Sequence, residues 1–425
     1  MTERPVSAEA QALDRDDRLA GLRARFRLPL GPDGRTAIYL CGNSLGPLPI
    51  DAEARIRDEL ERWATLAVRA HHDGAPPWMH YHQQFAAPLG RLVGASEREV
   101  IAMNTLTVNL HLLLVSFYRP TSGRHRILIE RGAFPSDRYA IVSQLRFHGF
   151  APEEALVEVG PRDGEDLLRT EDVVAAIERA QDSLALVLLP GVQYRTGQVL
   201  DLSAITAVAR RRGVVIGWDL AHSIGNVPVA LHDSGADFAV WCHYKYLCGG
   251  PGAIAGAFVH ARHARAPELP RFAGWWGHDA ATRFAMGPDF VPMHGAEGWQ
   301  LSNPPVLALA PLVAALEAFD SAGLAALREK SLRQTAFARR LIGERLAGRV
   351  AIVTPPGDAE RGCQLSLRLA DGADSGRRAF ARLTAAGVIG DWREPDVIRL
   401  APAPLYNTFA EVERAVGVLS DALAP

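Results

Sequence analysis

The chain has few cysteines and no motif that would gather them. Its 425 residues include only Cys41, Cys242, Cys248 and Cys363, and none of these forms a Cys-x-x-Cys pair. Four scattered cysteines argue against a disulfide-stapled scaffold and against a structural zinc site. The sequence therefore predicts a reducing, cytoplasmic setting and no bound metal.

An excess of charge and a long hydrophobic run are also missing. The 46 basic and 48 acidic residues give a net charge of −2, so no basic surface is expected to attract nucleic acid or an anionic membrane. The most apolar stretch, residues 110–118, is about half the length of a membrane helix. Residues 1–17 are polar and charged and lack the apolar core of a signal peptide. We predict a soluble protein that binds neither nucleic acid nor membrane.

What is present is a globular composition, with 48% hydrophobic and 22% charged residues. Short apolar runs alternate with helical patterns between residues 97 and 260, which is typical of a mainly parallel sheet covered by helices. The strands are rich in Val, Ile and Leu, as expected for strands buried on both faces. They are predicted at 127–130, 185–189, 214–218, 238–242 and 253–259, with helices at 171–181 and 201–212.

The rest of the chain predicts two further parts. A helix is expected at 51–68, and residues 260–305, rich in Gly, Trp and Pro, are expected to form a functional loop region. Helical sequence from 305 to 346, strands at 351–354, 364–369 and 397–400 and a helix at 409–422 predict a smaller α+β domain. We predict an α/β protein with an N-terminal segment (1–60) that packs with the small domain, a large domain (61–305) and a small C-terminal domain (306–425).

Two side chains carry the chemical interpretation. Asp219 ends one predicted buried strand, and ligands of open α/β sheets bind beyond such ends. Lys245 follows the next strand between Tyr244 and Tyr246, and partial desolvation suits a lysine to bond a carbonyl carbon. The pair predicts pyridoxal 5′-phosphate (PLP), whose aldehyde the lysine holds while the carboxylate keeps the pyridine nitrogen protonated.

Simpler alternatives exist for each of these residues. An isolated Asp can cap a helix and an isolated Lys can lie on the surface, but the strand ends and the Gly-rich turn at 249–252 favour PLP. That turn has neither Walker nor dinucleotide spacing. Thr107, near the start of an apolar helix, either donates to a phosphate or simply caps the helix, as Thr105 also could.

Several segments beyond these resemble the kynureninase family. They are 40–46, 134–137, 219–222, 244–247, 274–278, 302–305 and 398–407. The resemblance runs from about residue 38 to the C-terminus. The segments around Asp219 and Lys245 fit many PLP enzymes, whereas Gly-Trp-Trp-Gly-His, Ser-Asn-Pro-Pro and Pro-Leu-Tyr-Asn are far more specific.

The resemblance implies a fold type I PLP enzyme. Such an enzyme hydrolyses the Cβ–Cγ bond of L-kynurenine or 3-hydroxy-L-kynurenine to L-alanine and anthranilate or 3-hydroxyanthranilate, in tryptophan degradation or NAD biosynthesis. The resemblance also implies a homodimer with active sites at the subunit interface.

The resemblance assigns roles by position. Lys245 would hold the cofactor and remove the substrate α-proton, and Tyr244 would deliver a proton to the β-carbon. The cofactor would be bound by Leu106, Thr107, Phe134, Pro135, Ser136, Asp137, Asp219, His222, Tyr244, Lys245, Trp275 and Asn303, the last with Trp275 from the partner subunit. The substrate would contact Asn43, Ser44, His71, His278 and Arg399, and the Arg399 guanidinium would clamp its α-carboxylate. Polar Asn303 and His71 at the ring suggest that 3-hydroxykynurenine is accepted at least as well as kynurenine, which a comparison of kcat/KM tests.

Two positions depart from the family pattern. His243 stands where a small hydroxyl residue is usual, and Pro190 offers neither a hydroxyl nor an N–H. Both departures leave local contacts to the phosphate or lysine open. Cys242 and Cys248 flank the lysine and are expected to be core residues.

Four broader alternatives exist. His71, His72, His80 and His82 could form a metal site, although no acidic residue is close by in sequence. Trp275 and Trp276 could serve packing alone. The chain could instead be another carbon–carbon or carbon–sulfur PLP enzyme of the same fold, such as a cysteine desulfurase, but no cysteine lies on an obvious mobile loop. It could also be an inactive binding or scaffold protein, but Asp219, Lys245 and Arg399 are retained together.

Overall fold

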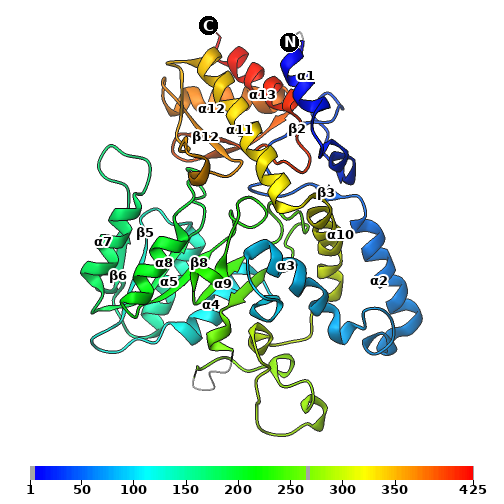
Figure 1. Ribbon diagram of the computed structural model, residues 1–425, viewed down its shortest axis with the longest axis vertical. Coiled ribbons are helices and arrows are strands. Elements are labelled where there is room, and N and C mark those ends of the chain that lie inside the picture. The colour runs from blue at the N-terminus through cyan, green and yellow to red at the C-terminus, as the bar shows by residue number, and fades with distance from the viewer. Residues whose placement is uncertain (1–4, 265–268, 425) are drawn as a thin grey trace.

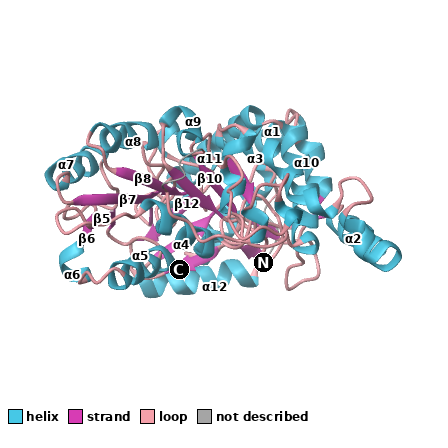
Figure 2. Cartoon of the chain, turned by 90° about the horizontal axis from the view of Figure 1, so that it is seen from below, coloured by secondary structure: helices cyan, strands magenta, loops and turns pink. Residues whose placement is uncertain are grey.

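A seven-stranded sheet forms the centre of the larger body of the molecule (Figures 1 and 2). The computed structural model describes residues 5–264 and 269–424. The strand order is β4-β10-β9-β8-β7-β5-β6, and β10 is antiparallel to both of its neighbours whereas the other pairs are parallel. The strands are β4 (Val100–Ala102), β5 (Arg126–Glu130), β6 (Leu156–Val159), β7 (Leu184–Pro190), β8 (Val215–Asp219), β9 (Phe238–Trp241) and β10 (Gly256–Val259).

Helices cover both faces of this sheet, which is why its strands read as continuous apolar runs. Alternate residues of one strand enter different apolar clusters: Leu128 packs into one cluster, whereas Ile127 and Ile129 pack into the other. The first cluster includes residues of α3 (Ala86–Val93), α7 (Thr170–Ala180), α8 (Leu202–Arg211) and α10 (Val306–Ala322). The second includes residues of α4 (Leu106–Phe117) and α5 (Pro135–Phe147).

A smaller body carries both chain ends, at the top of Figure 1. Its antiparallel sheet has the order β11-β12-β15-β14, and α1 and α12 pack against α13. N-terminal β2 pairs with β13 in parallel, and Ala10 and Leu40 lie in the apolar cluster of this body. The elements are α1 (Ala8–Arg15), β2 (Ile38–Tyr39), α11 (Leu324–Leu346), β11 (Val350–Ile352), β12 (Leu365–Leu369), α12 (Ala373–Ala385), β13 (Val388–Ile389), β14 (Asp391–Arg393), β15 (Val397–Leu400) and α13 (Phe409–Ala422).

The remaining elements connect the two bodies or lie at their edges. They are β1 (Phe26–Arg27), β3 (Leu48–Pro49), α2 (Ala52–Leu66), α6 (Pro152–Ala155) and α9 (Leu231–Ser234). Helix α2 packs against α10, which belongs to the core of the larger body. The division at residues 60 and 305 stays a prediction, and its residues 1–4, 265–268 and 425 lie outside the described part of the chain.

The predicted α/β class, with a mainly parallel sheet and a smaller α+β part, is confirmed. Helices α7 and α8 begin and end within one residue of prediction, and Asp201 caps α8 by accepting a hydrogen bond from the Ala204 N–H. The helical stretch 305–346 is broken at Gly323, where φ is 75°, because this backbone conformation does not continue a helix. Within the described residues, 260–305 hold only short 3₁₀ turns as helices.

Among the described helices, no single one is long and apolar enough to cross a membrane. Only α10 and α11 taken together reach that length and composition, and this pair is bent by 81°.

Candidate functional site

A cavity of about 120 Å³ lies at the carboxyl ends of the central parallel strands. Nine of the predicted cofactor and catalytic residues line it: Leu106, Thr107, Phe134, Ser136, Asp137, Asp219, His222, Tyr244 and Lys245. Pro135 is not among its lining residues. The cavity thus lies where ligands of open α/β sheets bind, beyond the carboxyl ends of the strands.

Lys245 is the lysine of this cavity. The chain has only two lysines, and the other, Lys330, is 6% exposed in α11 and pairs with Asp17 at 2.8 Å. The Lys245 Nζ atom lies 2.9 Å from the His222 Nε2 atom and 5.7 Å from the centre of the Phe134 ring. The scarcity of lysine is a sequence signal that singles out Lys245 without any motif.

His222 is a neutral neighbour of the amine. Burial, together with the positive charge of Lys245, holds the pKa of His222 well below its usual value. Because the Lys245 ammonium donates to Nε2, the ring proton sits on Nδ1. Nδ1 is buried and has no hydrogen-bond partner, which leaves a donor for a bound molecule.

Two buried carboxyl groups, those of Asp137 and Asp219, also line this cavity. Asp219, at the end of β8, accepts a 2.6 Å hydrogen bond from the Ala221 N–H, whereas Asp137 Oδ1 has no partner. Burial and the negative charge of Asp219 raise the pKa of Asp137 well above its usual value. Burial also raises the pKa of Glu130, at the end of β5, to about 8. The Lys245 charge offsets this rise only in part, so the acid pair fits a protonated pyridine nitrogen, which would bring a further positive charge and an N–H donor.

Two hydroxyl groups form a polar end to the cavity. Thr107 Oγ1 and Ser136 Oγ are 2.8 Å apart, in the first turns of α4 and α5 respectively. Helix N-termini stabilise phosphate through free N–H groups and the helix dipole. Thr105 is the N-cap residue of α4, but its side chain makes no capping hydrogen bond. The alternative that Thr105 simply caps this helix is therefore not supported by a hydrogen bond. The donor set therefore fits PLP, with its phosphate at the two helices and its ring nitrogen at the acid pair.

The two departures from the family pattern have different outcomes. His243 is fully buried outside the cavity lining, and its Nε2 accepts a 2.9 Å hydrogen bond from the Trp241 indole while its Nδ1 bonds the Ile254 carbonyl. Burial lowers the pKa of His243 to about 4, so it is a neutral core residue. Pro190 does line the cavity. Cys242 and Cys248 are buried, as predicted.

Arg399 is held by a network next to this cavity rather than in its lining. Its side chain is 1% exposed and forms a two-pronged ion pair with Asp391, while its Nη1 donates to the Tyr194 carbonyl. The Asn43 amide lies 3.2 Å from Arg399 Nε and Nη2 when its oxygen faces the guanidinium. Ser44, next to Asn43, is half-buried and does not line the cavity.

Sequence reasoning missed Tyr194 and Asp391. Tyr194 lines the cavity, and its ring contacts Phe134 edge-on at 5.3 Å. Its carbonyl, which accepts from Arg399, therefore connects the cavity to the arginine. Asp391 lies directly opposite Arg399 in the β14–β15 pair, so an Asp and an Arg flanking a Pro-containing turn were the available signal.

The remaining predicted residues do not reach the cavity within one chain. His71 is half-buried against the Trp78 ring, and His278 bonds the Thr282 hydroxyl. Trp275 is 41% exposed, and Asn303 is also exposed. In the histidine-rich segment, His82 is buried and pairs with Glu297 at 3.0 Å, whereas His72 and His80 are exposed, so the described chain does not gather these four histidines.

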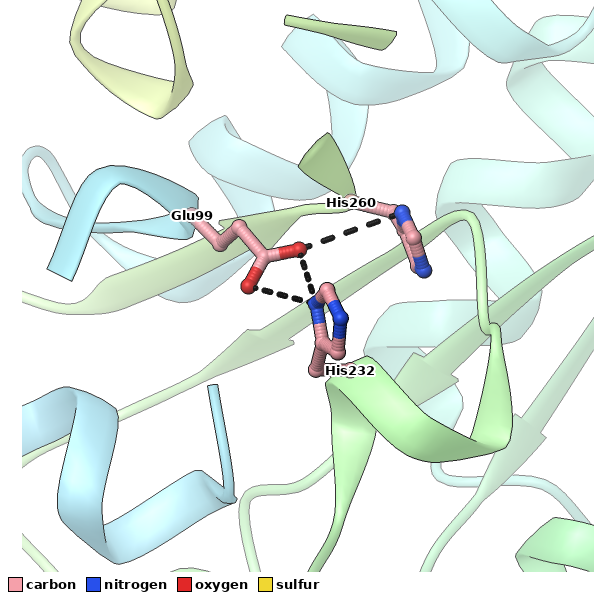
Figure 3. Close-up of side chains that lie close together, drawn as sticks. All are labelled: Glu99, His232 and His260. Carbon is pink, nitrogen blue, oxygen red and sulfur yellow. Dashed lines mark hydrogen bonds and ion pairs between the residues drawn. The ribbon is translucent and has the colours of Figure 1, made fainter. Parts of the chain in front are cut away.

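Among the described residues, one cluster with metal-ligand chemistry lies beside β4, β10 and α9 (Figure 3). Glu99 is 1% exposed and lies 2.8 Å from His232 Nδ1 and 3.8 Å from His260 Nδ1. The Glu99 oxygens already accept from two backbone N–H groups and a serine hydroxyl, and His260 Nδ1 accepts from the Arg262 N–H. Because these donor atoms are engaged, we interpret the cluster as a hydrogen-bonded hub that ties β4, β10 and α9 together.

Comparison with known proteins adds sequence relatives along nearly the whole chain. A family profile described as "Aminotransferase class-V" matches residues 38–364, and one described as "Kynureninase C-terminal domain" matches residues 327–419. The kynureninase of Myxococcus xanthus is 55% identical over 410 residues, 96% of each chain. The kynureninase of Xanthomonas euvesicatoria is 56% identical over 417 residues, 98% of each chain.

Solved structures show the same fold at low identity. A C-DES variant with glycine covalently linked to its PLP cofactor superposes with a TM-score of 0.76 at 17% identity, covering 94% of this chain and 99% of that one. The cysteine desulfurase of Thermococcus onnurineus gives a TM-score of 0.75 at 15% identity, covering 99% of each chain. These likenesses show the fold, and together with the class-V aminotransferase profile they identify the fold type I PLP architecture.

Proposed function

This chain belongs to the kynureninase family, and from that premise we propose how its own residues hydrolyse L-kynurenine to anthranilate and L-alanine. The enzyme is a PLP-dependent hydrolase of a carbon–carbon bond. The observation that carries the assignment of the site is the placement of Lys245. Of two lysines in the chain, it is the one in the cavity, between a neutral imidazole and a buried acid pair.

The residues that hold the cofactor follow from the cavity. When bound, PLP supplies an electron-withdrawing ring that stabilises negative charge next to the substrate nitrogen. Lys245 would bind its aldehyde, and Asp219, supported by Asp137, would hold the proton on its ring nitrogen. Thr107 and Ser136 would donate to its phosphate at the two helix N-termini.

The remaining residues handle the substrate and its protons. The Lys245 amine would take the α-proton of the substrate, and neutral His222 would keep this amine oriented by accepting its hydrogen bond. Burial raises the pKa of Tyr244, so its phenol stays protonated and can give a proton to the β-carbon. Arg399 binds the α-carboxylate, because a planar guanidinium holds a carboxylate in a two-pronged fashion.

A direct assay tests this function. Purified protein is mixed with PLP and L-kynurenine, and anthranilate is followed by its fluorescence while L-alanine is quantified. Equal amounts of the two products are expected. Release of sulfide or alanine from L-cysteine, without anthranilate from either kynurenine or 3-hydroxykynurenine, would instead support the desulfurase alternative. All four cysteines are buried, which weighs against that alternative.

We also propose a homodimer in the cytoplasm whose partner subunit supplies the ring end of the substrate pocket. Support comes from residues 269–303, which form the lower lobe in Figure 1 and expose Phe272, Trp275, Phe284, Met286 and Val291. A patch of large apolar side chains of this kind is typical of an interface. His71, His278 and Asn303 stay predicted ring contacts, as does acceptance of 3-hydroxykynurenine.

Complementation between subunits tests the dimer. Lys245→Ala and Asn303→Ala subunits are expected to be inactive as separate homodimers, because each lacks one half of every site. Mixed after partial unfolding and refolding together, they should regain roughly a quarter of wild-type activity, since one site in four is intact. Light scattering should give twice the mass of one chain, and a monomer with full activity would contradict the proposal.

The buried pair of Asp137 and Asp219 is expected to lower the folding stability of the cofactor-free protein while it favours PLP binding. Because folding raises the Asp137 pKa above 3.8, the folded protein binds more protons than the unfolded chain. The contribution of Asp137 to stability is therefore complete below about pH 4 and is lost as the pH rises through the folded-state pKa.

Asp137→Asn should accordingly raise the melting temperature of the cofactor-free protein near pH 8 while weakening its affinity for PLP. Thermal unfolding at about pH 5 and pH 8, with exposed Asp182→Asn as control, measures the first effect. Titration with PLP measures the second. A variant that is less stable near pH 8 would show that the pair is not under repulsion.

A further inference from the structure

We propose that Asp391 is a positioning residue that presents Arg399 to the α-carboxylate of the substrate. The inference rests on the proposed role of Arg399. Asp391 does not line the cofactor cavity, so it would act only through the guanidinium. Its place is set by the backbone, because β14 and β15 pair antiparallel with Asp391 directly opposite Arg399.

The hydrogen bonds of Arg399 fix which of its edges is available. A guanidinium has five N–H groups. Asp391 accepts from Nε and Nη2, and the Tyr194 carbonyl accepts from Nη1. Beyond the bonds to Asp391 and the Tyr194 carbonyl, two N–H groups remain, one on each terminal nitrogen, and a carboxylate can take one N–H from each of two nitrogens in two-pronged binding. The Asn43 amide, 3.2 Å from Nε and Nη2, is a neutral neighbour on the same guanidinium.

The charges around Asp391 leave this edge attractive to an anion. Asp391 also accepts a 3.1 Å hydrogen bond from Arg393, so one carboxylate is shared by two guanidinium groups and the trio carries a net charge of +1. Without Asp391, the almost fully buried Arg399 would lose its ion-pair partner. A buried charge that loses its partner is strongly destabilised, and Arg399 would turn toward other acceptors.

Asp391→Asn tests the inference in the PLP-loaded enzyme. We expect KM for L-kynurenine to rise by about 10-fold or more with kcat within about 3-fold, because the interaction removed acts on binding of the carboxylate. The Kd for PLP should not change. The inhibition constant of an analogue in which hydrogen replaces the α-carboxylate should also stay within about 2-fold, a readout that a merely structural role would not spare.

Asp396→Asn is the matched control. Asp396 lies on the same hairpin and pairs with Arg195 and Arg368, but not with Arg399. Its KM should match that of the wild type. If Asp391→Asn fails to fold, Asp391→Glu keeps the charge and should give a smaller rise in KM. An unchanged or lower KM in the folded Asp391 variant, or an equal loss of affinity for the carboxylate-free analogue, would overturn the inference.

Arg399→Gln separates failure of this inference from failure of the function on which it rests. If Arg399→Gln leaves KM unchanged, Arg399 is not the carboxylate clamp, and both claims fall. If Arg399→Gln raises KM and Asp391→Asn does not, only the role of Asp391 falls. In the Arg399→Gln background, adding Asp391→Asn should change KM by less than about 2-fold, because the two residues act as one unit.

Discussion

Lys245→Ala should lower kcat by about 10⁴-fold or more, the largest effect expected of any single substitution in this chain. The substitution removes the amine that binds the cofactor aldehyde and also the base that takes the α-proton. The cavity would still hold PLP through Asp219 and the two hydroxyls, so the variant should bind the cofactor without the visible absorption of a lysine-bound form. Steady-state rates and absorption spectra measure the two effects separately.

Lys330→Ala is the control that the composition of the chain provides. Lys330 is the only other lysine, and it is buried in an ion pair with Asp17 away from the cavity. Its loss should reduce stability by about 3 kcal/mol, because Asp17 is left without its partner, yet leave kcat per folded molecule unchanged. A Lys245→Ala variant that retains more than a few per cent of kcat would contradict the assignment of Lys245.

Asp219→Asn should lower kcat by about 10³-fold, the second largest effect. An amide in place of the carboxylate cannot hold the proton on the ring nitrogen, so the ring withdraws electrons less strongly. Binding of L-kynurenine should change far less than kcat, because Arg399 is untouched. Stopped-flow measurement of α-proton release, compared with steady-state kcat, would locate the loss at the proton-removal step.

Asp237→Asn serves as the matched control for Asp219→Asn. Asp237 is also a buried aspartate next to a strand of the same sheet, but it lies at the amino end of β9 and pairs with Arg262 and His263. This variant should be less stable and catalytically normal once folded. Equal losses of kcat in the two variants would mean that Asp219 acts through the fold rather than on the cofactor.

The parts of the fold that were predictable are those with a local signal. Strands β5, β7, β8 and β9 are buried on both faces and therefore appear in the sequence as short, mainly apolar runs. Edge strand β6 has only one fully buried residue, and β4 has three residues in all, so neither gives a run long enough to detect. Helix α5 is not predicted either, since residues 134–137 enter the sequence analysis only through their resemblance to the family.

Some residues of the site could also be predicted from the sequence, and others could not. Asp219 and Lys245 were predictable because strand ends in a parallel sheet meet at one edge. The engagement of Arg399 by Asp391 is a tertiary contact with no periodicity of its own, although the hairpin brings the two residues opposite each other. The ring pocket stays a prediction, because Trp275 and Asn303 are exposed and do not line the cavity.

Reduction of the PLP-loaded protein with borohydride tests the central claim most directly. This treatment converts a lysine-bound cofactor into a stable amine, and peptide mapping then shows which lysine carries the added mass. With only two lysines in the chain, the answer is unambiguous. The cofactor is expected on Lys245 alone, in protein that forms anthranilate before reduction. Label on Lys330, or active protein without label on Lys245, would contradict the account.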